Sequence, residues 1–160
     1  MSPIRADAIG LSLREPQAWV GSSLPQWETL VRHARRTNLL PRVAVTFDEL
    51  GLLPQVPPAP RAHLVAARAL AQAQADAVRR EVAHIDRALA ATDVPIVLLK
   101  GAGYLLAGLP AARGRIFSDI DILVPRSALA QVVSGCDCFE FPYGALEDAV
   151  AVLDDAARRA

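Results

Sequence analysis

The chain has little cysteine, few aromatic residues and no excess of charge of either sign. Its 160 residues include two cysteines and 5% aromatic residues, with 17 basic residues against 17 acidic ones. Cys136 and Cys138 are two residues apart, and two thiols spaced this way along a strand cannot readily bridge each other. Without further cysteines or nearby histidines they also fall short of a zinc site. We therefore expect reduced thiols and no disulfide framework.

The balanced charge and the lack of a long apolar run each exclude a class of protein. A formal net charge of zero provides no long-range attraction to nucleic acid, which argues against a dedicated DNA or RNA binder. No stretch approaches the length needed to span a bilayer, and the N-terminus does not read as a signal peptide. We expect a cytoplasmic protein that does not associate with a membrane.

Several common catalytic motifs are also missing. There is neither a Gly-x-Ser-x-Gly elbow nor a Walker-type phosphate loop. His33, His63 and His84 are scattered, and none has a carboxylate or thiol at ligand spacing, so we interpret all three as surface residues. Any chemistry must therefore come from another group of residues.

Helical patterns dominate the first part of the chain. Apolar residues at three- and four-residue steps predict helices over about 8–13, 24–38 and 41–51, and a long helix over 61–92 that is rich in Ala, Arg and Leu. The prolines between residues 54 and 60 predict a stiff, extended connector. The arginines at 79, 80 and 87 alternate with acids, which favours a solvated face over a phosphate-binding one.

Two apolar runs interrupt the helical pattern. Residues 94–99 and 116–124 are rich in β-branched side chains, which predicts two buried strands, joined by a short helix over 104–109. This density and the surrounding Gly and Pro argue against a purely helical interaction protein. Beyond them we expect a helix over 126–133, a third strand over 136–141 and a terminal helix over 142–159.

The second run contains two carboxylates, Asp119 and Asp121. Residues two apart on a strand share a face, so these side chains are expected to point together and to repel unless a cation or proton compensates them. Carboxylates at this separation suit Mg²⁺, which also takes substrate phosphates and water. Arg115 offers an alternative, because an ion pair with either aspartate would compensate the charge without metal.

A glycine-rich turn, Lys100-Gly101-Ala102-Gly103, follows the first run. Glycines between a strand and a helix let the backbone approach a phosphate closely. Lys100 is the one lysine among the 17 basic residues and would add a point charge there. The alternative is a lysine that merely extends from a strand end to solvent.

Together these residues resemble the nucleotidyltransferase superfamily related to DNA polymerase β. The Leu98-Leu99-Lys100-Gly101-Ala102 turn, with Arg115 ahead of Ser118-Asp119-Ile120-Asp121-Ile122-Leu123-Val124, is most similar to its uncharacterised bacterial branch. The resemblance implies an α/β (α+β) fold, with a helical N-terminal region over 1–60 packed on a small nucleotidyltransferase-like sheet and flanking helices over 61–160. The family's later Asp-or-Glu-Leu-His-Trp stretch is absent, so this core could be incomplete at its C-terminal end.

The resemblance also implies a reaction and its site. Asp119 and Asp121 would bind Mg²⁺, and Gly101, Ala102 and Gly103 would hold the phosphates of a nucleoside triphosphate, with Lys100, Arg115 and Ser118 beside them. The product would be a nucleoside monophosphate on a hydroxyl of a small molecule or a protein. Ala102 departs from the usual serine.

A third carboxylate is left open by the sequence. Glu140, on the expected third strand, could complete the metal site or be an ordinary edge-strand residue. The alternative to the enzyme is a truncated or degenerate relative that only binds a nucleotide or a protein partner.

Overall fold

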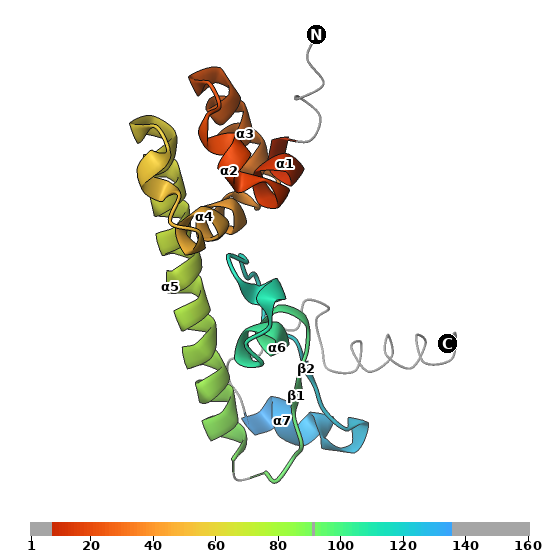
Figure 1. Ribbon diagram of the computed structural model, residues 1–160. Helices are drawn as coiled ribbons and strands as arrows, with labels where there is room; N and C mark the ends of the chain where they lie inside the picture. Colours follow the sequence, from red (N-terminus) through yellow and green to blue (C-terminus); the bar gives the residue numbers. More distant parts are fainter. Residues whose placement is uncertain (1–7, 91, 136–160) are drawn as a thin grey trace, which may run out of the picture. The chain divides into compact units, whose positions relative to one another are not determined.

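The computed structural model describes residues 8–90 and 92–135, which are mostly helical (Figure 1). Two short strands, β1 (Val97–Leu98) and β2 (Ile122–Leu123), form an antiparallel pair. The α-helices of the described part are α1 (Ala8–Arg14), α2 (Pro16–Val20), α3 (Leu24–Arg36), α4 (Leu40–Glu49), α5 (Pro58–Leu89), α6 (Lys100–Leu106) and α7 (Leu129–Gly135). Single 3₁₀ turns lie at Leu53–Gln55, Pro110–Ala112 and Arg126–Ala128.

The sheet is much smaller than the sequence predicts. The runs over 94–99 and 116–124 pair only at the two-residue strands β1 and β2. Neither run is covered on both faces by described residues, since Val97 is 53% exposed and Leu123 is 56% exposed. A β-rich composition forms a strand only where a partner satisfies its backbone groups. The α/β expectation is therefore confirmed in part: the described chain is mostly helical, with one two-stranded sheet.

The helices of the first half agree well with the periodicity. Helices α1, α3, α4 and α5 lie within a few residues of their predicted bounds. The extended proline connector is wrong in extent, because a 3₁₀ turn occupies Leu53–Gln55 and α5 already begins at Pro58. Proline is tolerated in the first turn of a helix, where its missing N–H would have no intrahelical partner.

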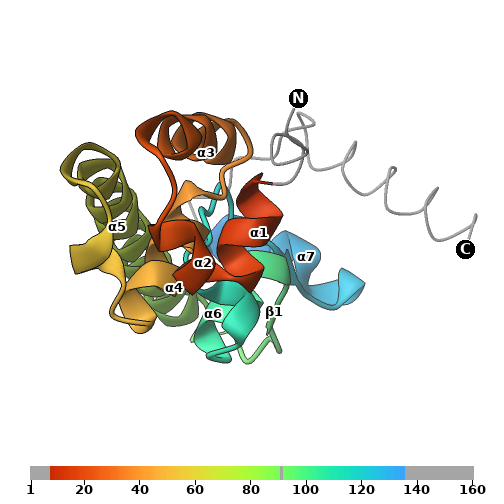
Figure 2. The same ribbon diagram turned by 45° about the horizontal axis from the view of Figure 1, so that its top comes forward.

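The main hydrophobic core lies among helices α1 to α4 and the start of α5 (Figure 2). Trp27, Phe47 and Leu64 are each fully buried in it. The Trp27 ring meets Phe47 edge to face at a centroid distance of 5.5 Å and meets Trp19 at 6.2 Å. Such aromatic pairs add about 0.5–1.5 kcal/mol beyond the area they bury. The core therefore fixes α3 and α4 against each other.

The chain divides into two compact units, one formed by Met1–Glu81 with Leu98–Asp121 and the other by Val82–Val97 with Ile122–Ala160. The first unit contains the aromatic core, helix α6 and the residues from Lys100 to Asp121. The described part of the second unit contains the end of α5, strand β2 and helix α7. The predicted boundary between 1–60 and 61–160 remains a prediction.

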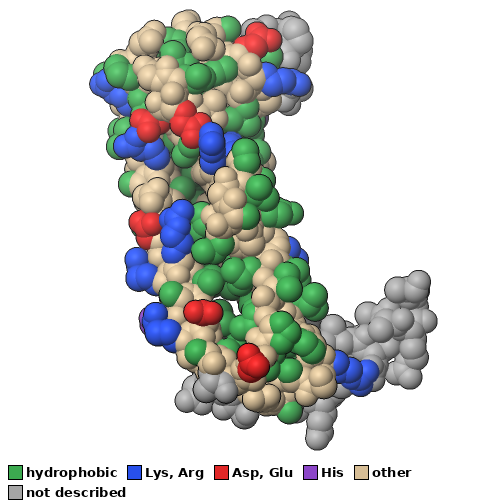
Figure 3. Space-filling view, turned by 60° about the horizontal axis from the view of Figure 1, so that its bottom comes forward, with side chains coloured by type: hydrophobic (Ala, Val, Ile, Leu, Met, Phe, Trp, Pro, Cys, Tyr) green, Lys and Arg blue, Asp and Glu red, His purple; other side chains and the backbone are tan. Residues whose placement is uncertain are grey.

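Some expected elements lie outside the described residues. The third strand over 136–141, the terminal helix over 142–159, both cysteines and Glu140 belong to this group. Of the described helices, none is both long and apolar enough to cross a membrane. On the face drawn in Figure 3, basic and acidic side chains are interspersed among apolar ones, as the balanced composition leads one to expect.

Candidate functional site

The Lys-Gly turn is held against the aspartate segment by the backbone. The Leu99 N–H donates a hydrogen bond to the Asp121 carbonyl at 2.9 Å, directly beside the paired strands. Helix α6 starts at Lys100, so the glycines form its first turn instead of the loop that the sequence predicts before a helix over 104–109. The turn and the aspartates, 21 positions apart in the chain, thus meet at one place.

Gly103 is required by this close approach. A Cβ at this position would lie 2.7 Å from the carbonyl oxygen of Leu98, a backbone atom that cannot move aside cheaply. Only glycine therefore allows the first turn of α6 to rest on the end of β1. Gly101 is covered differently: its missing Cβ would lie 3.0 Å from Nε of Arg115 and 3.1 Å from the Phe117 ring.

Lys100 compensates the charge of Asp121. Its Nζ lies 3.1 Å from both carboxylate oxygens of Asp121. The lysine side chain is 69% exposed and that of the aspartate 31%. Since the Arg115 side chain makes no hydrogen bond or ion pair with a described residue, the charge of Asp121 is neutralised by lysine, and not by the arginine that the sequence offered as an alternative.

Asp119 is the more open of the two carboxylates. It is exposed, and its Oδ1 accepts a hydrogen bond of 2.6 Å from the Ser118 hydroxyl. Both aspartates precede β2, which starts at Ile122, so the strand geometry from which a common face was predicted begins only after them. Ile120 and Ile122 are partly buried and do not enter a closed core.

The backbone of Lys100 is unusual. Its φ is +47°, in the left-handed region that non-glycine residues rarely adopt. Such conformations cost on the order of 1–3 kcal/mol and persist where the surroundings hold them in place. Here Leu99 is fixed by its hydrogen bond to Asp121, and the strained backbone directs the lysine side chain to the same residue.

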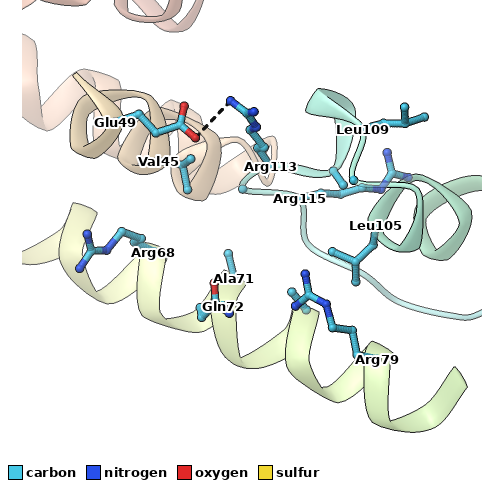
Figure 4. Close-up of a pocket in the computed structure, with 14 residues that line it drawn as sticks. Val45, Glu49, Arg68, Ala71, Gln72, Arg79, Leu105, Leu109, Arg113 and Arg115 are labelled. Atoms are coloured by element: carbon cyan, nitrogen blue, oxygen red, sulfur yellow. Dashed lines mark hydrogen bonds and ion pairs between the residues drawn. The ribbon is translucent and has the colours of Figure 1, made fainter. Parts of the chain in front are cut away.

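Arg115 and Phe117 connect the aspartate segment to helix α5. The Phe117 N–H donates to Oε1 of Gln74 on α5 at 3.0 Å. Arg115 lies over Gly101 and also lines a cavity of about 270 Å³ between α4, α5 and α6 (Figure 4). The sequence did not predict this cavity, because its walls come from segments distant in the chain.

The sequence signal that could have indicated this cavity is the set of arginines that line it. Arg79, assigned to a solvated face from the sequence, lines the cavity, and its partner is Asp76 at 3.0 Å. The alternation of acids and bases on α5 predicted a solvated face, and the Arg79 side chain is 48% exposed. It did not reveal that the basic side chains also border a hollow.

The donor atoms fit a hard divalent cation only in part. Asp119 and Asp121 supply carboxylate oxygens, the ligands that Mg²⁺ takes together with phosphates and water. Among residues 8–90 and 92–135, no three His, Cys, Asp or Glu side chains form a group that could hold a metal. Two carboxylates are thus present, and the third candidate, Glu140, lies outside the described residues.

Comparison with known proteins identifies a family for this chain. A family model described as "Uncharacterised nucleotidyltransferase" matches residues 23–134, more than half of the chain, and covers every candidate site residue from Lys100 to Asp121. Glu140 lies beyond the matched range. Neither the search of curated proteins nor that of solved structures found a match.

Proposed function

We propose, from the premise that this chain belongs to the family of uncharacterised nucleotidyltransferases, that it transfers a nucleoside monophosphate from a nucleoside triphosphate to a hydroxyl group. The acceptor would be a small molecule or a protein, and the reaction would depend on Mg²⁺ in the cytoplasm. The observation that carries the proposal is the contact of Lys100 with Asp121, because it joins the Lys-Gly turn to the aspartate segment.

Different residues of the chain would have different roles in this reaction. Asp119 and Asp121 would hold Mg²⁺, which when bound neutralises phosphate charge and lowers the pKa of a coordinated hydroxyl. Ser118 orients Asp119 through its hydroxyl. Lys100, now on Asp121, is long and exposed enough to turn to a phosphate oxygen once the aspartate has another cation.

The phosphates would lie along the first turn of α6. Gly101, Ala102 and Gly103 lack bulky side chains, so a phosphate would approach the backbone of this turn closely once the Arg115 and Phe117 side chains, which cover Gly101, make room. The Gly103 N–H already donates to the Leu99 carbonyl at 3.2 Å, which leaves the N–H groups nearer the start of the turn for the phosphate. Arg115, over Gly101, would add a guanidinium to the same oxygens. Ala102 is buried, with 1% of its surface exposed, so a methyl group and not a hydroxyl packs inward here.

The transfer itself is a single displacement. The acceptor's oxygen forms a bond to the α-phosphorus while the bond from that phosphorus to the bridging β-oxygen breaks. Pyrophosphate leaves with the electron pair, and the hydroxyl proton passes to solvent. The chain's task is to align the two oxygens and to offset the negative charge.

A second candidate is a non-catalytic relative that binds a nucleotide or a protein partner. Two observations favour it: Lys100 already neutralises Asp121, and the described residues provide no third carboxylate. A site of this kind would bind a triphosphate through Lys100 and Arg115 without needing metal.

Thermal-shift titration of the full chain with each nucleoside triphosphate, with and without Mg²⁺, tests both candidates. We expect a nucleotide-induced rise in Tm that requires Mg²⁺ and is abolished in Asp119→Asn, since this change removes a charge and keeps the shape. Asp86→Asn, at an exposed position of α5, is the matched control and should leave the shift intact.

The other outcomes separate the candidates. A shift that is equal without Mg²⁺ and survives Asp119→Asn favours the binding protein. No shift with any nucleotide contradicts the nucleotide-based versions of both.

A further inference from the structure

We infer that the cavity between α4, α5 and α6 is the acceptor subsite and that it takes a small anionic molecule with a compact apolar body. The inference rests on the proposed function and adds the chemical class of its acceptor. All lining residues belong to the first compact unit. The volume of about 270 Å³ is just below the range of about 300–1,000 Å³ typical of drug-sized ligands, which favours a small acceptor over a macromolecular one.

The base of the cavity is apolar. Ala71 and Ala75 of α5 and Leu105 of α6 are all buried side chains that line it, and Leu105 points toward α5 in Figure 4. An all-polar triphosphate would leave these carbons against charged oxygens. A ring or a short aliphatic body fits them better, because it removes their surface from water.

The rim is cationic. Arg68, Arg79, Arg113 and Arg115 line the cavity, and Glu49 is the one acid among the lining residues. Three of the arginines are paired, Arg68 with Asp48, Arg79 with Asp76 and Arg113 with Glu49. Counted over the described residues, four positive charges less three negative ones leave one positive charge, at Arg115. A neutral nucleobase would gain little from this charge, whereas a carboxylate or phosphate would gain a charge-assisted hydrogen bond.

The existing ion pairs do not prevent a ligand from binding. The paired side chains of Arg79 and Arg113 are 48% and 56% exposed, and exposed ion pairs contribute little to stability. A ligand anion can therefore replace Asp76 or Glu49 at small cost. Arginine is suited to this exchange because its planar guanidinium binds carboxylate and phosphate with two hydrogen bonds.

Arg115 joins the cavity to the transferase residues. Its side chain lines the cavity and also covers Gly101 in the proposed phosphate turn. The segment that follows it is fixed to α5 through Gln74, and α5 also forms the cavity base. An acceptor held here by its acid group would share Arg115 with the nucleotide, so its hydroxyl could be presented to the α-phosphorus.

Isothermal titration of the full chain with phenyl phosphate, with benzyl alcohol as the neutral counterpart, tests this inference. We expect phenyl phosphate to bind and benzyl alcohol to bind much more weakly. Arg79→Gln and Arg113→Gln should each weaken the binding of phenyl phosphate by about three- to tenfold, which is the range that the net contribution of a typical hydrogen bond implies. Arg80→Gln, an exposed neighbour that does not line the cavity, is the matched control and should have no effect.

A second set of titrations separates this inference from the proposed function. Asp119→Asn should bind phenyl phosphate as the parent does, although it loses the nucleotide-induced rise in Tm. A saturating non-hydrolysable nucleoside triphosphate analogue with Mg²⁺ should leave the phenyl phosphate site available.

Four results would overturn the inference. Equal binding of phenyl phosphate and benzyl alcohol would contradict an anion subsite. Equal affinity of the parent, Arg79→Gln and Arg113→Gln proteins for phenyl phosphate would contradict it as well. Competition between the analogue and phenyl phosphate would assign the cavity to the nucleotide. If the chain binds phenyl phosphate but no nucleotide, the cavity is an anion site and is not an acceptor subsite.

Discussion

At the scale of single residues, Lys100 combines an unfavourable backbone conformation with an ion pair in the candidate site. Its left-handed φ of +47° sets it apart from the residues around it, and its ammonium group neutralises Asp121. Strain of this kind in a folded protein commonly occurs where geometry serves a site. In this chain it places the single lysine at the junction of the two motifs.

Two substitutions of Lys100 separate its charge from its backbone strain. Lys100→Gln loses an ion pair that is largely exposed and should lower the free energy of unfolding by less than about 1 kcal/mol. Lys100→Gly should be at least as stable as Lys100→Gln, because relief of about 1–2 kcal/mol of left-handed strain exceeds the entropy cost of glycine, about 0.5–1 kcal/mol. Urea unfolding measures both. A glycine variant clearly less stable than the glutamine variant would show that the strain is not real.

Gly103 provides a second prediction at this scale. Gly103→Ala places a methyl group 2.7 Å from the Leu98 carbonyl oxygen and should destabilise the chain by about 1–3 kcal/mol through overpacking. Gly21→Ala is the control, because nothing lies within 4 Å of its missing Cβ and its φ of −75° suits alanine. Equal urea midpoints for the two variants would contradict the close approach of α6 to β1.

At the scale of elements, α5 serves both the core and the candidate site. Near its start Leu64 is fully buried in the aromatic core. Further along, Ala71 and Ala75 form the base of the cavity, and Gln74 holds the Phe117 backbone. Small side chains on this face leave room for a cavity, whereas larger ones would fill it.

Two leucines of α5, one buried and one exposed, allow a matched test of this role. Leu64→Ala should lower the free energy of unfolding by about 2–5 kcal/mol, since it opens a cavity in a packed core. Leu70→Ala removes the same atoms from a side chain that is 54% exposed and should change the stability by less than about 0.5 kcal/mol. Chemical denaturation compares them directly. Similar losses for both would mean that the face of α5 is assigned wrongly.

At the scale of the whole molecule, charge is balanced in number. The 17 basic and 17 acidic residues cancel, and both signs occur together on the face drawn in Figure 3. A surface of this kind does not attract a polyanion over long distances, while local arginines can still bind a small anion. A low-molecular-weight acceptor is consistent with this pattern.

Nucleic-acid binding should accordingly be weak. Fluorescence anisotropy with a labelled DNA duplex and a labelled single-stranded RNA should give dissociation constants above about 10⁻⁴ M near physiological salt, the weak end of non-specific binding. The titration is repeated at lower salt. Micromolar affinity that falls steeply with salt would contradict the prediction and place a nucleic acid among the acceptors.

Much of this architecture could be predicted from the chain, and particular residues show where prediction stopped. The 3.6-residue pattern predicted α3, α4 and α5, and the Lys-Gly and Ser-Asp-x-Asp motifs indicated the family that residues 23–134 match. The pairing of Asp121 with Lys100 was not predicted, because β-branched residues suggested longer strands and therefore a different geometry for the aspartates.

Local sequence by itself determined where the helices run and which residues are candidates for the chemistry, because periodicity, capping and glycine act over a few neighbouring positions. Only the tertiary structure decided that Lys100 meets Asp121, that Arg115 lies over Gly101, and that arginines from α5 and from the segment after α6 border one cavity. These contacts join positions far apart along the chain, and which of them form depends on packing the whole set of helices at once.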